Sequence, residues 1–285
     1  MSAVGGLRDE CALESMTRLR QFRNNVTASL ATLFRHPRSE GPRPAWPAHS
    51  RLAIGAAAAI LAVVLGMMLV DVWSIGRVRT LPWWVVAFFS YVTDFGLSGW
   101  FLWPTGLMLV ALALVYRPST PLCVRGVLSA VAVRLGFLFA AIAVPGLFVA
   151  ILKRLIGRAR PFIEGSDTWA YLPFAWRPDY ASFPSGHATS AFAAAVAIGA
   201  LWPQARPVMW VYAVLIALSR VAVGAHHPSD VIAGAIVGSL GALLVRNWFA
   251  RRRLGFVVGP DGLVRKLPGP SWRRIKAVAR GLVSA

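Results

Sequence analysis

Two histidines beside apolar stretches are the side chains of this chain best suited to chemistry. His187 closes the turn sequence Pro184–His187, which opens an Ala-rich run, and His226 stands four residues before Asp230. An imidazole can attack an electrophilic centre or exchange a proton near neutral pH. A carboxylate four residues away can hold one tautomer of an imidazole and stabilise its positive form. The two motifs therefore predict one nucleophile and one general acid.

Basic side chains accompany both motifs. Lys153 precedes Arg160 by seven positions, which is two turns if a helix continues between them, and Arg220 lies six positions before the second histidine. Cationic groups bind phosphate oxygens through charge-assisted hydrogen bonds. The backbone N–H groups of Ser185 and Gly186, at the start of a predicted helix, would add donors. These residues predict a site for a phosphate ester that needs no metal and no cofactor.

Each of these residues has an ordinary structural interpretation when it is taken alone. A basic residue at a helix end commonly snorkels toward lipid phosphate, and Ser-Gly at a helix start is commonly only a cap. Several such coincidences at three helix ends are much less expected than one shared site. Three further loop arginines could bind a second phosphate or a lipid head group, although solvated loop charges are the more ordinary interpretation: Arg154, Arg158 and Arg177.

The composition of the chain indicates a membrane protein. Hydrophobic residues make up 57% of the 285 positions and charged residues only 14%, which is more apolar than a soluble domain. The mean hydropathy is +0.60. A formal charge of +19 fits either nucleic acid or an anionic membrane surface, and the long apolar stretches favour the membrane over nucleic acid. The two cysteines, Cys11 and Cys123, suggest neither a disulfide framework nor a metal site.

Apolar stretches of membrane-spanning length predict an all-α, polytopic bundle of six transmembrane helices. The predicted crossings are 52–70, 100–116, 135–152, 188–202, 208–223 and 231–245. Asp71 follows the first crossing and is expected at the membrane interface. The mixed stretch 74–98 is expected to be a short interfacial or re-entrant helix.

Positive charge predicts the orientation, because cytoplasmic segments carry an excess of Lys and Arg. Residues 1–51 hold eight Arg, and residues 246–285 hold ten Lys and Arg against one acid. Both termini are therefore expected in the cytoplasm. The loops 74–98, 153–183 and 224–228 would face outward, which places all three motifs on the extracytoplasmic side.

The chain is predicted to have three regions: an N-terminal arm (1–51), a membrane domain (52–247) and a basic tail (248–285). Within the arm, apolar residues at helical spacing over 13–33 fit a helix lying on anionic lipid of the cytoplasmic leaflet, or equally a helix packed on the protein. The tail is expected to hold a small hairpin over 257–264 and a basic surface helix.

The combination Lys153-x6-Arg160-Pro161, Pro184-Ser185-Gly186-His187 and Ser219-Arg220-x5-His226-x3-Asp230 resembles a known signature. It is similar to the complete tripartite motif of the type 2 phosphatidic acid phosphatase superfamily. That superfamily joins membrane lipid phosphatases with soluble vanadium haloperoxidases and acid phosphatases. The motifs cover 153–230, and the helical layout extends the likeness to 52–247.

The resemblance implies a role for each matching residue. His226 would attack phosphorus to give a phosphohistidine, Asp230 would orient His226, and His187 would protonate the leaving oxygen and then activate water. Spacing to Asp230 alone leaves the neighbouring His227 open as the nucleophile, whereas the family pattern selects His226. The residues that would bind the phosphoryl group are Lys153, Arg160, Ser185, Gly186 and Arg220.

The sequence thus predicts a metal-independent phosphatase in a bacterial-type inner membrane, acting on a lipid phosphate or diphosphate. Undecaprenyl diphosphate, phosphatidylglycerol phosphate, phosphatidic acid and lipid A phosphates all fit this chemistry. A lipid phosphotransferase could use the same residues, and a transporter or scaffold with a degenerate site is the alternative from another class. A haloperoxidase fits poorly, because those relatives are soluble.

Overall fold

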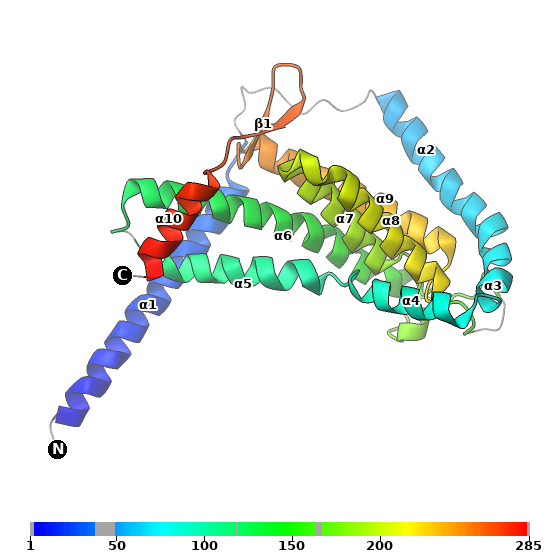
Figure 1. The fold of residues 1–285 in the computed structure, drawn as a ribbon, viewed down its shortest axis with the longest axis horizontal. Coiled ribbons are helices and arrows are strands. Elements are labelled where there is room, and N and C mark those ends of the chain that lie inside the picture. The colour runs from blue at the N-terminus through cyan, green and yellow to red at the C-terminus, as the bar shows by residue number, and fades with distance from the viewer. Residues whose placement is uncertain (1–2, 38–48, 118, 164–166, 284–285) are drawn as a thin grey trace. The chain divides into compact units, whose positions relative to one another are not determined.

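The computed structural model describes residues 3–37, 49–117, 119–163 and 167–283 as an almost wholly helical chain (Figure 1). The α-helices are α1 (Ala3–Phe34), α2 (His49–Leu65), α3 (Asp71–Arg79), α4 (Trp83–Asp94), α5 (Gly99–Val115), α6 (Leu122–Ile156), α7 (Gly186–Leu201), α8 (Arg206–Ala222), α9 (Pro228–Arg251) and α10 (Trp272–Val283). Short 3-10 turns lie at Pro178–Tyr180 and Pro203–Ala205. Strands β1 (Phe256–Val258) and β2 (Val264–Lys266) pair antiparallel. This pairing confirms the predicted tail hairpin.

Among the described residues, five helical stretches are long and apolar enough to cross a membrane. They are Leu52–Arg79, Trp83–Val115, Leu122–Ile156, Pro203–Ala222 and Pro228–Arg251. The fourth predicted crossing, 188–202, corresponds to α7, which is apolar but has only 16 residues. The all-α, polytopic architecture is confirmed, while the count of six crossings stays a prediction. Within 74–98, α4 is a separate short helix that ends at Asp94, and together with α5 it forms one apolar segment of membrane-spanning length; its interfacial or re-entrant placement stays a prediction.

The chain forms two compact units. One comprises Met1–Pro44, Pro104–Gly136 and Trp248–Ala285, and the other comprises Ala45–Trp103 and Phe137–Asn247. In the first unit, the side-chain amide of Asn25 in α1 donates to the carbonyls of Ala113 and Tyr116 near the end of α5, each at 2.8 Å. The arm helix therefore packs on the protein along this part of its length. All candidate site residues belong to the second unit.

Close packing between α7 and α9 sets the framework of the second unit, in which α7, α8 and α9 run side by side (Figure 1). Gly234 and Gly238 stand one turn apart on α9. A Cβ atom there would lie 2.5 Å from the Ser185 carbonyl oxygen and 2.3 Å from the Thr189 carbonyl oxygen, respectively. The absence of side chains lets the two backbones touch, as small residues four apart commonly do between membrane helices. The start of α7 is thereby held against the start of α9.

The first predicted crossing continues beyond its expected end. A π-helical turn, Gly66–Val70, joins α2 to α3 without a break. Gly66 packs against α9, because an added Cβ would meet the Ser229 Cβ at 3.4 Å. This approach carries Asp71 into the protein, where its exposed fraction is 0%. The expectation of an interfacial Asp71 is therefore wrong: the side chain is buried in a polar network described below.

Candidate active site

The loop after α6 brings Lys153 and Arg160 together. The helix ends at Ile156 rather than continuing to Arg160. Gly157 takes a left-handed conformation (φ +65°), and an added Cβ would lie 1.7 Å from the Leu172 carbonyl oxygen, so only glycine fits. Beyond it the loop doubles back: the Leu172 N–H donates to the Gly157 carbonyl at 2.7 Å. The helix does not continue from Lys153 to Arg160, yet the two side chains still lie within electrostatic range of each other.

The second motif caps α7 and touches the third. The Ser185 hydroxyl accepts from the Ala188 N–H at 3.5 Å, and the Ser185 N–H donates to the Asp230 carbonyl at 2.9 Å. That N–H is therefore not open to phosphate, which corrects part of the prediction for this residue. Gly186 lies close to a cation: the Lys153 ammonium is 3.5 Å from the position that a Cβ on Gly186 would take. The α7 start and Lys153 thus form one face of the site.

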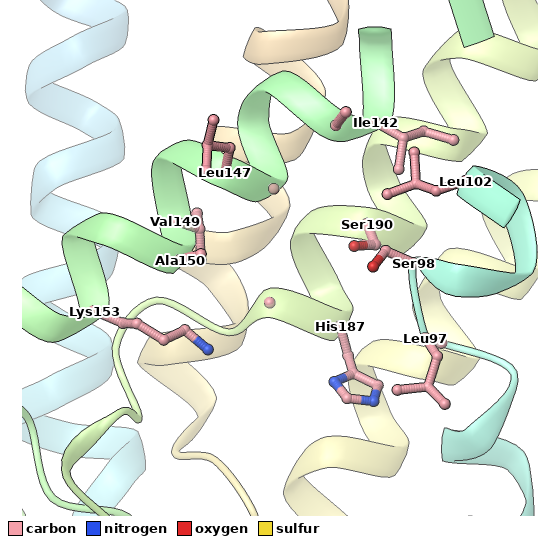
Figure 2. Close-up of a pocket in the computed structure, with 14 residues that line it drawn as sticks. Leu97, Ser98, Leu102, Ile142, Leu147, Val149, Ala150, Lys153, His187 and Ser190 are labelled. Atoms are coloured by element: carbon pink, nitrogen blue, oxygen red, sulfur yellow. The ribbon is translucent and has the colours of Figure 1, made fainter. Parts of the chain in front are cut away.

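A cavity of about 400 Å³ opens beside this face. Its polar end carries Lys153, Gly186 and His187, and Figure 2 shows the Lys153 and His187 side chains at the same end of the space. The rest of the wall is largely apolar and includes Leu97, Leu102, Ile142, Leu147, Val149 and Ala150. A cavity of this form can accept an apolar chain whose polar end meets a cation and an imidazole.

His226 lies in the short turn between α8 and α9, against Asp230. Its Nδ1 is 3.7 Å from Asp230 Oδ2, within ion-pair range but longer than a hydrogen bond. Catalytic hydrogen bonds are often long in a site without substrate. Burial lowers the pKa of His226 to about 4; the cations Arg220 and Arg160 act in the same direction, and Asp230 opposes them. The ring is therefore neutral near pH 7, which is the form of a nucleophile.

The neighbouring imidazole of His227 faces different charges. Both rings interact with Asp230, but their other charged neighbours differ: Arg220 and Arg160 act on His226, whereas Arg158 and Asp71 act on His227. Burial also lowers the pKa of His227. The other catalytic candidate, His187, interacts with His226 and with the same two cations, Arg220 and Arg160. The ring of His226 is thus the one grouped with the cations that could bind phosphate.

Arg220 is anchored by a residue that the sequence motifs do not include. Its Nη1 donates to Thr93 Oγ1 at 2.6 Å, and its side chain is largely buried near the end of α8. Thr93 lies at the end of the aromatic-rich helix α4. Polar residues in an otherwise apolar helix were the available signal for such a role. Ser219, the residue before Arg220, instead bonds back to the Ile216 carbonyl of its own helix at 2.7 Å.

Arg158 is the largest departure from the sequence-based interpretation. Rather than meeting a head group or solvent, its side chain is 1% exposed and pairs with two carboxylates, Asp230 at 2.6 Å and Asp71 at 2.7 Å. These carboxylates raise the pKa of Arg158 against the effect of burial. The other two loop arginines are placed more as a solvated charge would be: Arg177 forms an exposed pair with Asp179, and Arg154 lies over the Trp176 ring.

Known proteins are similar to this chain over the region that holds the motifs. A family model described as the PAP2 superfamily matches residues 134–254. The chain is 35% identical over 202 residues to a lipid A 1-phosphatase of Rhizobium johnstonii, covering 70% of this chain and 82% of that protein. It is 39% identical over 109 residues to a decaprenylphosphoryl-5-phosphoribose phosphatase of Mycobacterium tuberculosis, covering 36% of this chain and 58% of that protein. A crystal structure of a PAP2-type phosphatidylglycerolphosphate phosphatase of Bacillus subtilis has a TM-score of 0.47 at 21% identity, covering 67% of this chain and 94% of that one.

Proposed function

Because the chain belongs to the PAP2 superfamily, we propose that it is an integral membrane phosphatase acting on a phosphate or diphosphate carried by a lipid, with 52–247 as its phosphatase domain. The observation that carries this proposal is the meeting of three distant motifs in one unit. Lys153 lies against Gly186, and Ser185 is bonded to Asp230. An apolar cavity leads to the same place, as an amphiphilic substrate requires.

The chemistry follows from the neutral state of His226. Its imidazole attacks phosphorus, a nitrogen–phosphorus bond forms, and the bond from phosphorus to the leaving oxygen breaks. Burial and the cation Arg220 lower the pKa of His187 to about 3, so this ring takes up a proton only when the negative charge of a bound phosphate raises its pKa. The protonated His187 donates that proton to the leaving oxygen, and the neutral ring then accepts a proton from the attacking water. That water breaks the phosphohistidine bond, which frees inorganic phosphate and restores His226. Negative charge on the phosphoryl oxygens is balanced by Lys153, Arg160 and Arg220.

The positive charge at the two ends of the chain supports an orientation in the membrane. We place the termini in the cytoplasm because of the Arg-rich ends, and the site on the extracytoplasmic side of a bacterial inner membrane. The basic ends would then face anionic lipid. The lipid A 1-phosphatase relative favours a lipid A phosphate as the first substrate to examine.

Phosphate release from four lipids tests the function. Purified protein in detergent is given lipid A, undecaprenyl diphosphate, phosphatidylglycerol phosphate and phosphatidic acid, and free phosphate is measured. His226→Ala should lower the rate by about 10³-fold or more, since loss of a nucleophile removes the covalent route. The matched variant His227→Asn, one position along, should keep most of the rate if it folds. Full activity in folded His226→Ala would refute the mechanism.

Two reagents separate this chemistry from a metal-dependent route. Vanadate resembles a phosphoryl group in transfer and should inhibit by occupying the cationic site. EDTA should leave the rate unchanged, since the proposed steps use only side chains. Strong inhibition by EDTA, reversed by added divalent metal, would contradict the proposal. A lipid acceptor that becomes phosphorylated in place of phosphate release would identify a phosphotransferase.

A further inference from the structure

A buried polar network lies behind Asp230, among residues to which the proposed chemistry assigns no role. Arg158 Nη1 donates to Asp230 Oδ1 at 2.6 Å, and Arg158 Nη2 donates to Asp71 Oδ2 at 2.7 Å. Arg158 is 1% exposed, and both carboxylates are 0% exposed. The three charges come from α3, the loop after α6, and α9, so the network joins elements far apart in the sequence.

The Asp71 carboxylate accepts hydrogen bonds from Ser229 as well as from the Arg158 guanidinium. Its Oδ1 accepts from the Ser229 N–H at 3.0 Å, and its Oδ2 accepts from the Ser229 hydroxyl at 2.5 Å. The Ser229 hydroxyl in turn accepts from Arg158 Nη1 at 2.7 Å. One carboxylate therefore binds the first turn of α9, and this turn carries Asp230.

The Asp230 carboxylate is fixed at both oxygens. Oδ1 accepts from Arg158, while Oδ2 accepts from the Ser182 hydroxyl at 2.5 Å and the His227 N–H at 2.9 Å. Oδ2 is also the oxygen 3.7 Å from His226 Nδ1. With these partners in place the carboxylate cannot rotate, and the edge it presents to the nucleophile is set by Arg158 and Ser182.

A purely stabilising function explains this network poorly. Burying ions costs desolvation energy, and buried ion pairs can often be replaced by apolar side chains without loss of stability. Here two carboxylates share one guanidinium, which leaves an excess of one negative charge behind the His226 side of the site. The same excess would stabilise the positive charge that an imidazole acquires as it bonds to phosphorus.

We propose that Arg158 and Asp71 are positioning residues for the reaction. Arg158 fixes the Asp230 carboxylate, and Asp71 fixes both Arg158 and the first turn of α9. Asp230 Oδ2 then stays directed at His226 while the ring becomes positive. This inference rests on the proposed phosphatase function and extends it to residues that do not touch the substrate.

Charge balance gives the inference a specific test. Asp71→Asn removes the excess negative charge, and Arg158→Gln adds a second one. The double variant Asp71→Asn/Arg158→Gln returns the network to one excess negative charge. If the balance and the placement of Asp230 both matter, the double variant should be more active than Arg158→Gln alone, and the two effects should not be additive.

The measurement is steady-state phosphate release in detergent, on whichever of the four lipids above the wild-type chain cleaves fastest. Asp71→Asn is expected to lower kcat about tenfold, and Arg158→Gln about a hundredfold, as misplacement of a catalytic group does. KM should change less than about threefold, because neither residue contacts the phosphate. The control is Asp261→Asn, which removes a comparable but exposed ion pair and should leave kcat and KM unchanged.

The outcomes are separable. A folded Asp71→Asn protein with wild-type kcat, or a double variant no more active than Arg158→Gln, overturns the positioning role while leaving the phosphatase intact. A change confined to KM overturns it as well. If Arg158→Gln does not fold, the kcat and KM of Asp71→Asn still decide the question. Absence of phosphate release from wild-type protein on all four lipids would overturn the proposed function together with this inference.

Discussion

Two Arg–Asp pairs in this chain have nearly the same geometry in opposite surroundings. Arg158 and Asp230 lie 2.6 Å apart with exposed fractions of 1% and 0%. Arg265 and Asp261, in the tail hairpin, also lie 2.6 Å apart, with exposed fractions of 63% and 40%. Distance alone does not distinguish them, and the consequences of breaking them should differ greatly. The surroundings of an ion pair, rather than its length, decide what it contributes.

The difference arises from what replaces a lost partner. At the hairpin, water can solvate either charge once the other is removed, and salt already screens the pair. At the Arg158 network the side chains are buried, so loss of the guanidinium would leave Asp71 and Asp230 as two buried like charges. The fold around the site therefore depends on the buried pair, whereas the exposed pair contributes little to stability.

Removing the buried cation should give the largest effect on stability. Arg158→Gln leaves two buried carboxylates without a counter-charge, which is expected to cost about 3–5 kcal/mol of unfolding free energy. The measurement is the thermal unfolding midpoint in detergent. Asp71→Asn/Arg158→Gln should recover part of the loss, because one of the two carboxylates is neutralised. An Arg158→Gln protein as stable as the wild type would show that water reaches this network.

The buried histidine turn should make stability depend on pH. Burial lowers the pKa of His226 from 6.5 to about 4, so the unfolded chain binds more protons than the folded one between these values. The stabilising effect is therefore complete above pH 6.5 and is lost as the pH falls toward 4. The full loss amounts to about 3 kcal/mol. His226→Gln should weaken this dependence of the unfolding midpoint, and an unchanged dependence would assign it to other groups such as His227.

The sequence was enough to identify the chemical motifs and the helical class. His226 and Asp230 are four residues apart, His226 just before α9 and Asp230 in its first turn, so their proximity is local and can be predicted. Apolar stretches likewise predict membrane helices from length alone. The tail hairpin follows from a Gly-Pro-Asp-Gly turn between short apolar runs. Each of these features depends on residues that are close in the chain.

Features that depend on packing between distant elements could not be predicted. Asp71 and Arg158 are separated by 87 positions, and their pairing requires Gly66 to pack against Ser229. An acid at the end of an apolar stretch looks interfacial until its partner is known. The spacing of Lys153 and Arg160 fits two helical turns, yet the helix ends at Ile156, and a left-handed Gly157 and a folded loop lie between the two residues. The motif could be recognised from the sequence, whereas the loop that positions it could not.

An intermediate effect is expected at the buried cation Arg220, whose anchor Thr93 is a neutral side chain. Thr93→Val keeps the side-chain shape but removes the oxygen that accepts from Arg220 Nη1. Among the described residues, Arg220 Nε already has no hydrogen-bond partner, so the guanidinium would lose further compensation. A hydrogen bond to a charged group contributes about 2 kcal/mol. We expect a lower unfolding midpoint and weaker vanadate inhibition, both largely restored by Thr93→Ser; unchanged vanadate inhibition would show that Thr93 does not orient Arg220.

The smallest effect should follow the loss of the exposed pair. Arg265→Gln removes the partner of Asp261, but the pKa of that carboxyl is lowered first by the Leu263 N–H, which donates to it at 3.1 Å, and only secondarily by Arg265. The pKa of Asp261 should therefore remain below its ordinary value in the variant, as carboxyl NMR titration of the full chain in micelles would report. The unfolding midpoint should shift by about a tenth of the Arg158→Gln effect or less, and less still in high salt. A return of the Asp261 pKa to its ordinary value would show that, even at the surface, the guanidinium outweighs the backbone donor.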